Sequence, residues 1–190
     1  TYAMYEIYNR IFRTKLAKIT YDPVSFRLKK NELAKFIKSS PSMVFIPNPN
    51  QPIEDPLSIK EIDHLCKLAS GYGVLIIVDE AYYMFGCTSA ISLINKHKNL
   101  IILRSFSKAF GIPSIRLGFI ISNQKNIQLL SATRLAYESN YLSDTVAIYF
   151  LKNMKIIHNY IDQVKKGRDF FKKKIQQLGF KVVGGKANFL

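Results

Sequence analysis

The sequence predicts an α/β fold, in which a mostly parallel sheet carries helices on both faces and is followed by the start of a smaller C-terminal α+β domain. Three apolar runs of strand length support this prediction, at residues 74–78, 100–103 and 117–121. Nearly every position in these runs is apolar, which indicates strands buried on both faces. Such strands are typical of parallel sheets with helical crossovers.

The first part of the chain adds two strands, a helix and a loop to this scheme. Residues 14–20 alternate between apolar and polar side chains and predict a strand, and residues 30–39 place apolar side chains on one helical face. Residues 42–46 predict a short strand. The prolines of residues 47–52 exclude a helix there and predict a shaped loop.

A capping pattern marks the beginning of the next helix. Ser58 stands three residues before Glu61, and apolar residues follow at helical spacing. We expect this helix to end at Gly71 to Gly73, before the first continuous apolar strand.

The last third of the chain changes to long helical patterns. We predict helices over about 126–137 and 141–178, and a strand at 180–183. The domain division that follows is a large domain over 1–155 and the start of a small domain over 156–190. The chain starts with Thr1 and lacks the order of a signal peptide, so we expect it to be a fragment.

The composition narrows the possible functions. The formal net charge is +15, from 28 Lys and Arg against 13 Asp and Glu, which favours anionic partners. The densest basic groups, 165–168 and 172–174, lie on a predicted amphipathic helix, where a solvated face is the simpler interpretation. Nucleic-acid binding therefore remains a minor alternative.

Metal and membrane functions find no support in the sequence. The two cysteines, Cys66 and Cys87, are far apart, and the three histidines are scattered, so we expect reduced thiols in a cytoplasmic protein and no metal site. No apolar run approaches the roughly 20 residues that a membrane-spanning helix needs, so we expect no membrane association.

Polar side chains follow the apolar strands, where parallel sheets bind ligands at the carboxyl ends of their strands. The candidates are an acid and a phenol after residue 78, an amine with nearby hydroxyls and a guanidinium after residue 103, and two amides in the proline-rich loop. After residue 78 these are Asp79 and Tyr82. After residue 103 they are Lys108, Ser105, Ser107 and Arg116, and in the proline-rich loop they are Asn50 and Gln51.

These residues resemble the class I and II aminotransferases, which are fold-type I enzymes dependent on pyridoxal 5'-phosphate, and among them the histidinol-phosphate aminotransferases. The resemblance extends over nearly the whole chain. Its most specific part is the eight-residue spacing from Lys108 to Arg116, followed by Gly118. The matching segments are TYAMY at 1–5, NPNQP at 48–52, VDEAY at 78–82, and SFSKAFG at 105–111 continuing to RLG at 116–118.

The resemblance implies a role for each of the central residues. Lys108 would form a Schiff base with the cofactor aldehyde and later act as the catalytic base. Asp79 would keep the pyridine nitrogen protonated, and Tyr82 would donate to the phenolic oxygen of the cofactor. Glu80 is adjacent to Asp79, but its side chain should point to the opposite side of the strand.

The resemblance also implies how the cofactor is held. Ser105, Ser107 and Arg116 would bind the phosphate through hydroxyl and guanidinium donors. Tyr2 would stack on the cofactor ring.

One segment departs from the family pattern. The usual Asn-Pro-Asn-Asn-Pro-Thr-Gly is here NPNQPIE at residues 48–54, so the Thr-Gly pair is lost. The amide that touches the phenolic oxygen of the cofactor falls on Gln51, although Asn50 also fits, and a cis bond before Pro52 is a hypothesis. This change puts the substrate in doubt more than the cofactor.

The function that the resemblance implies is transfer of an amino group between an amino acid or an amino-alcohol phosphate, of the histidinol phosphate kind, and a 2-oxo acid in amino-acid biosynthesis. The partners would be a small-molecule amino donor and acceptor, and the enzyme would be a homodimer. Alternatives are a phosphothreonine-type decarboxylase, a non-catalytic aminotransferase-like regulatory module, and an inactive paralogue.

Overall fold

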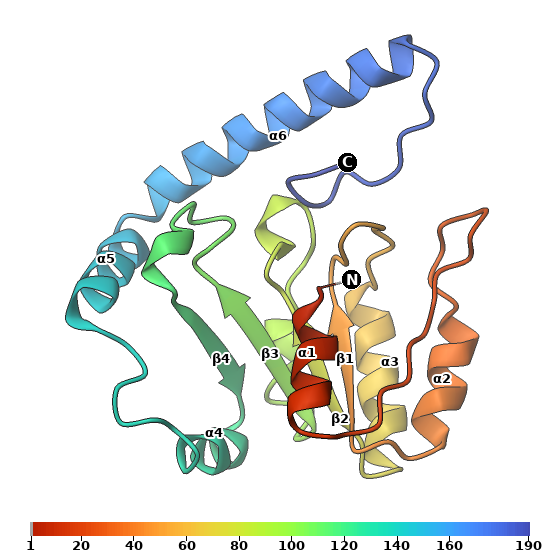
Figure 1. The fold of residues 1–190 in the computed structure, drawn as a ribbon, viewed down its shortest axis with the longest axis vertical. Coiled ribbons are helices and arrows are strands. Elements are labelled where there is room, and N and C mark those ends of the chain that lie inside the picture. Colours follow the sequence, from red (N-terminus) through yellow and green to blue (C-terminus); the bar gives the residue numbers. More distant parts are fainter. Residues whose placement is uncertain (1) are drawn as a thin grey trace.

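A computed structural model describes residues 2–190, and Thr1 of the first matching segment lies outside the described residues. The chain forms a four-stranded sheet with helices around it and a long helix that extends away from it (Figure 1). The strands are β1 Met43–Pro47, β2 Leu75–Asp79, β3 Leu100–Ser105 and β4 Gly118–Ser122. The α-helices are α1 Met4–Ile11, α2 Lys30–Lys38, α3 Ile59–Ser70, α4 Gln124–Ser131, α5 Tyr141–Lys152 and α6 Met154–Gln177. Three short 3₁₀ turns are η1 Tyr83–Phe85, η2 Ala90–Leu93 and η3 Pro113–Ile115.

The sheet has the strand order β1-β2-β3-β4. The pairs β1–β2 and β2–β3 are parallel, whereas β4 runs antiparallel to β3. The prediction of a mostly parallel α/β sheet is therefore confirmed. The antiparallel strand follows because the chain turns back after β3 through residues 106–117, and that turn carries several of the predicted site residues.

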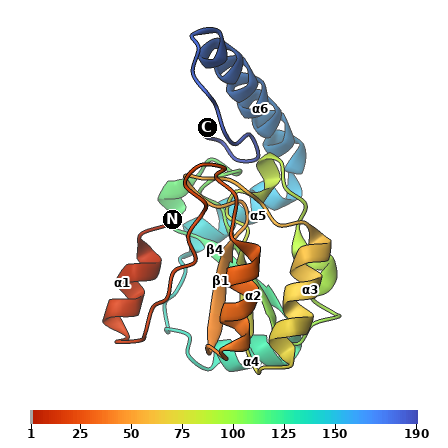
Figure 2. The same cartoon turned by 90° about the vertical axis from the view of Figure 1, so that its right-hand side faces the viewer.

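Helices cover both faces of the sheet, as predicted. Figure 2 shows α1 on one side of β1 and the helices α2 and α3 on the other side. On the α2 and α3 side, fully buried residues such as Ile62, Ile76 and Ile102 form the main core. The α3 helix begins with the predicted capping box, because Ser58 accepts from the Glu61 backbone and Glu61 accepts from the Ser58 backbone.

A second core joins the last helices to the sheet. Phe106 and Phe110 come from the turn after β3, Phe85 from η1, and Ile157 and Ile161 from the first half of α6. The distal half of α6 extends away, and the segment after it turns back toward the upper edge of the sheet in Figure 1. This return places residues 184–190 near the carboxyl ends of the parallel strands.

Four predictions about local structure were wrong. Residues 14–20 form no strand, because no neighbouring strand is available to pair with them. Nearby, an isolated bridge joins Tyr21 to Leu28. Residues 180–183 are likewise irregular. The predicted helix over 126–137 is the shorter α4, and the helix over 141–178 is two helices. The break falls at Asn153, whose φ of −120° and ψ of 45° are not helical.

No helix within residues 2–190 is both long and apolar enough to cross a membrane.

Candidate functional site

The candidate site lies at the carboxyl ends of the three parallel strands. The register places Pro47 at the end of β1 opposite Asp79 at the end of β2. The Asn48 amide continues this pairing by donating to the Asp79 carbonyl oxygen at 2.8 Å. The loops after β1, β2 and β3 therefore leave the sheet at one edge, which is where the sequence placed the candidate residues.

The side chains of Asp79 and Glu80 enter different environments, as their strand positions predict. One Asp79 oxygen accepts from the Ala81 amide at 3.0 Å, and the other accepts from the Tyr5 hydroxyl at 2.5 Å. Glu80 is only 2% exposed and pairs with Arg104, whose Nη2 lies 3.0 Å from its Oε2. Asp79 therefore belongs to the site edge, whereas Glu80 belongs to a buried structural ion pair.

Tyr5 is a further candidate residue that the sequence argument did not single out, although it lies inside the matching TYAMY segment. Its burial, and then the neighbouring Asp79 carboxylate, raise the pKa of the Tyr5 phenol far above its usual value. The phenol therefore stays protonated and donates to Asp79. Two hydrogen bonds use about half of the lone-pair positions of the carboxylate, so Asp79 retains capacity for another donor.

Tyr82 is the centre of the second group of site residues. Its hydroxyl donates to the side-chain oxygen of Gln51 at 2.9 Å. The Lys108 Nζ lies 5.2 Å from the centre of the Tyr82 ring, a cation–π distance. On the same ring Phe189 packs edge-on at 5.2 Å between centroids. The structure thus brings together a phenol, an amide and an amine from three loops, with an aromatic side chain from the C-terminal segment.

The two candidate amides of the proline-rich loop differ in their contacts. Asn50 is buried, and its amide donates to the Ile53 carbonyl oxygen at 2.9 Å within the same loop. Gln51, in contrast, contacts Tyr82. The Gln51–Pro52 peptide is cis, as hypothesised from the sequence, and so is the Asn48–Pro49 peptide.

The predicted phosphate-binding residues lie at the end of β3 and in the turn after it. The Ser105 hydroxyl accepts from the Ser107 amide at 3.0 Å, and this hydrogen bond stabilises the first turn after the strand. Arg116 adopts a left-handed φ of 51°, and its guanidinium donates to the Pro113 carbonyl oxygen at 2.7 Å. Arg116 is exposed, so this guanidinium is accessible to an anion.

Tyr2, the predicted stacking residue, lies at the beginning of the described chain and is 56% exposed. Its ring packs edge-on against Tyr5 at 5.8 Å between centroids. Tyr5 in turn lies 5.2 Å from the Phe45 ring of β1 and donates to Asp79. Tyr2 is therefore connected to the site through Tyr5.

The chemistry of this donor set fits pyridoxal phosphate. An amine, a carboxylate and a phenol lie at one sheet edge with two hydroxyls and a guanidinium in the adjoining turn, which correspond to the aldehyde, the ring and the phosphate of that cofactor. Metal ligands are not gathered in this way. Within the described part of the chain, no three His, Cys, Asp or Glu side chains form a cluster that could hold a metal ion.

The whole chain, residues 1–190, matches the model of the family described as aminotransferase class I and II. A curated relative, the histidinol-phosphate aminotransferase of Thermotoga neapolitana, is 32% identical over 190 residues, which are 100% of this chain and 54% of that protein. The chain thus spans about half the length of the curated relatives it matches.

Solved structures show the same similarity. The histidinol-phosphate aminotransferase of Clostridium acetobutylicum superposes with a TM-score of 0.90 at 27% identity, over 98% of this chain and 57% of that one. The Sinorhizobium meliloti protein of that name, solved in complex with pyridoxal-5'-phosphate, gives a TM-score of 0.89 over 98% of this chain and 51% of its own. At 17% identity, this second likeness concerns the fold alone.

Proposed function

The chain belongs to the class I and II aminotransferase family, and from that premise we propose that it forms the cofactor-binding part of a pyridoxal-phosphate-dependent aminotransferase. The observation that carries the proposal is the convergence on Tyr82. Lys108, Gln51 and Tyr82 come from three separate loops and meet at the edge where Asp79 ends β2.

When bound, pyridoxal phosphate supplies an aldehyde that condenses with amines and a ring that accepts electrons. Lys108 is the residue of this chain that would hold the aldehyde carbon covalently and, once displaced by the amino donor, would move the proton at the substrate α-carbon with its Nζ. Asp79 would stabilise the protonated pyridine nitrogen, and the Tyr5 hydrogen bond would orient its carboxylate. Tyr82 and Gln51 would bind the phenolic oxygen of the ring.

The phosphate and the ring face would be held by residues outside this group. Ser105 at the end of β3 and Ser107 in the turn after it offer hydroxyl donors, and Arg116 offers a forked guanidinium suited to a dianion. Tyr2 would cover one face of the ring. Asn50 would support the site by closing the loop that presents Gln51.

For the substrates we propose an amino-alcohol phosphate of the histidinol phosphate kind, or an amino acid, as amino donor and a 2-oxo acid as acceptor. The names of the curated and solved relatives support this choice. Decarboxylation of a phosphorylated amino acid would use the same cofactor residues, because the bond that breaks depends on substrate orientation. Assays of both reactions with the complete protein that contains this chain separate the two.

The experiment that tests cofactor binding is reductive trapping. Pyridoxal phosphate is added to the chain, the visible absorption is recorded, the adduct is reduced with borohydride, and the modified peptide is mapped by mass spectrometry. We expect the label on Lys108 and loss of the absorption band in Lys108→Ala, whereas Lys125→Ala, which removes an exposed lysine of α4, retains both. Folded protein that labels only surface lysines would contradict the proposal.

We further propose that the complete enzyme is a cytoplasmic homodimer. The connection between α4 and α5 and the start of α5 expose a run of large apolar side chains, which a partner subunit would cover. These are Leu135, Tyr137, Tyr141 and Leu142, which are between 72% and 95% exposed. Sedimentation of the complete protein should give a dimer, and Tyr137→Ser with Leu142→Ser should shift it toward monomer.

A further inference from the structure

We propose that Glu54 is a positioning residue that ties the C-terminal segment, residues 184–189, to the proline-rich loop and thereby holds Phe189 against Tyr82. The inference rests on the proposed function, because Tyr82 belongs to the proposed cofactor site. Glu54 stands where the family pattern has the glycine of its Thr-Gly pair, so the clamp uses a side chain that the pattern lacks.

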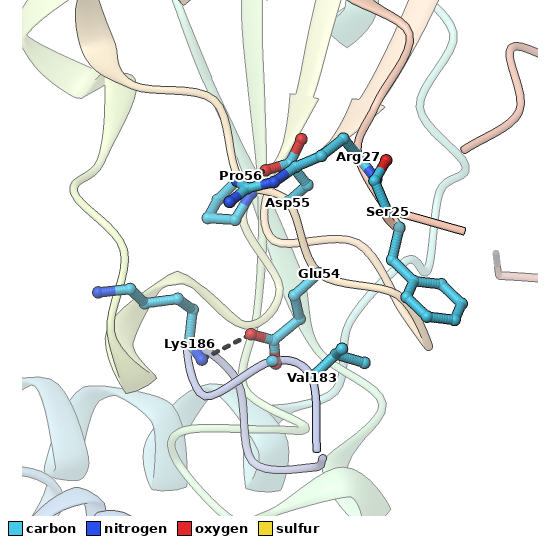
Figure 3. Close-up of a pocket in the computed structure, with 9 residues that line it drawn as sticks. Ser25, Arg27, Glu54, Asp55, Pro56, Val183 and Lys186 are labelled. Atoms are coloured by element: carbon cyan, nitrogen blue, oxygen red, sulfur yellow. Dashed lines mark hydrogen bonds and ion pairs between the residues drawn. The ribbon is translucent and has the colours of Figure 1, made fainter. Parts of the chain in front are cut away.

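The carboxylate of Glu54 bridges two successive backbone amides. Its Oε2 accepts from the Lys186 amide at 2.6 Å, and its Oε1 accepts from the Ala187 amide at 2.9 Å. Figure 3 shows the Glu54 side chain pointing across the cavity toward the backbone at Lys186, with Val183 beside it. Each carboxylate oxygen thus faces one N–H group, and such charge-assisted bonds are about twice as strong as neutral ones.

The C-terminal segment is shaped to receive this carboxylate. Gly184 has a φ of +95°, and a Cβ built there would lie 3.3 Å from the carboxylate carbon of Glu54. A side chain at Gly184 would therefore crowd the carboxylate as well as strain the backbone. The cavity around these residues, about 220 Å³ in volume, also includes Arg27 and Asp55.

The segment is held from its other side by α6. The Arg168 guanidinium, whose side chain is 9% exposed, donates to the Ala187 carbonyl oxygen at 2.8 Å and to the Phe85 carbonyl oxygen at 3.3 Å. Ala187 is fully buried between these contacts. Arg168 is thus an exception to the predicted solvated basic face, because it anchors backbone rather than facing water.

The position of Phe189 follows from these anchors. It lies two residues after Ala187, and its ring packs edge-on against Tyr82. On the other side, Glu54 is connected to Tyr82 through the backbone of the proline-rich loop. Glu54 lies three residues after Gln51, whose side-chain oxygen accepts from the Tyr82 hydroxyl. Loop and segment therefore close a ring of contacts around Tyr82, and the Glu54 carboxylate is the side chain that joins them.

The test compares Glu54→Gln with wild type in the complete protein that contains this chain, with Glu32→Gln on α2 as the matched control. Gln has nearly the same shape, but its NH₂ group would oppose one of the two N–H donors. We expect amide hydrogen exchange at residues 186 and 187 to become about tenfold or more faster, as the loss of a hydrogen bond to a charged group predicts. Gly184→Ala should produce the same local change from the other side of the contact.

The KM of the enzyme distinguishes a positioning role of Glu54 from a purely structural one. With histidinol phosphate and 2-oxoglutarate as probes, we expect Glu54→Gln to raise KM about tenfold while kcat changes less than about twofold, because displacement of Phe189 from Tyr82 weakens the binding of ground and transition states equally. Loss of folded protein would instead lower kcat at constant KM. Unchanged exchange at 186 and 187, or faster exchange with unchanged KM, would overturn the inference.

Failure of this inference is distinguishable from failure of the proposed function. If wild-type protein shows no label on Lys108, the cofactor assignment fails, and the proposed role of Glu54 at that site fails with it. If the label is present and the exchange is unaffected by Glu54→Gln, only the positioning role of Glu54 is lost.

Discussion

Asn48 offers a sharp test of how the loop that presents Gln51 is built. Its side chain is 2% exposed and bridges the loop by bonding both backbone groups of Leu57. The side-chain amide donates to the Leu57 carbonyl oxygen at 3.1 Å, and the side-chain oxygen accepts from the Leu57 amide at 2.8 Å. Asn48→Ala would remove both bonds at once.

The cost follows from what Asn48→Ala leaves behind. Each lost hydrogen bond removes about 1 kcal/mol of net stability, and the buried N–H and C=O of Leu57 then lack partners, so we expect a total loss of about 3 kcal/mol. For a domain of this size the loss corresponds to a fall in Tm of about 6 to 12 °C. Asn48→Asp should lose less, because its carboxylate still accepts from the Leu57 amide.

Urea unfolding followed by far-ultraviolet circular dichroism measures this difference, with thermal unfolding as a second probe. Asn95→Ala, at an exposed position, is the matched control and should change stability by less than about 0.5 kcal/mol. A loss below about 1 kcal/mol for Asn48→Ala, at an unchanged m-value, would refute the argument that this bridge holds the loop.

Three further predictions follow from ionisable and buried groups. The Lys30 ammonium and the Ser58 amide lower the pKa of Glu61 to about 2, so its stabilisation is present above about pH 4.5 and is lost as the pH falls toward 2. Because Glu61 is partly exposed, Glu61→Gln should lose about 1 kcal/mol at pH 7 in chemical denaturation, and the loss should shrink as the pH falls through 2; equal losses at pH 7 and below pH 2 would contradict this. Arg104→Met should cost about 3 to 5 kcal/mol in the same assay, because it leaves the Glu80 carboxylate buried without its cation, and a loss below 1 kcal/mol would refute the ion pair's role. Burial raises the pKa of the Cys66 thiol to about 12, so its reaction with a disulfide reagent at pH 8 should be far slower in native protein than in urea, and equal rates would show an accessible thiol.

The parts of the fold that were predictable are those where local pattern and burial agree. Residues 74–78 and 100–103 became the central strands, because an uninterrupted apolar run is stable only when both faces are covered. Ser58 and Glu61 marked the beginning of α3, since a capping box is a local interaction. The strands predicted at 14–20 and 180–183 failed because a strand needs a ladder partner, which no local pattern reports.

The candidate site was predictable to a similar extent. Strand-end position and the family pattern together pointed to Lys108, Tyr82 and Asp79, whose side chains the structure places at one sheet edge. The contacts of Tyr5 and Phe189 were not foreseen, because they join segments that lie 74 and 107 residues from their partners in the chain. Whether these residues hold the cofactor stays a prediction until the trapping experiment is done.

The sequence by itself determined the class of sheet, the sheet edge at which the candidate residues lie, and the family, since each depends on residue types at fixed spacing. Only the tertiary structure decided which amide of the proline-rich loop meets Tyr82, and that Glu54 accepts from the backbone of Lys186 and Ala187. These outcomes depend on where distant segments return in space. The same carboxylate would be an ordinary solvated acid if the C-terminal segment lay elsewhere.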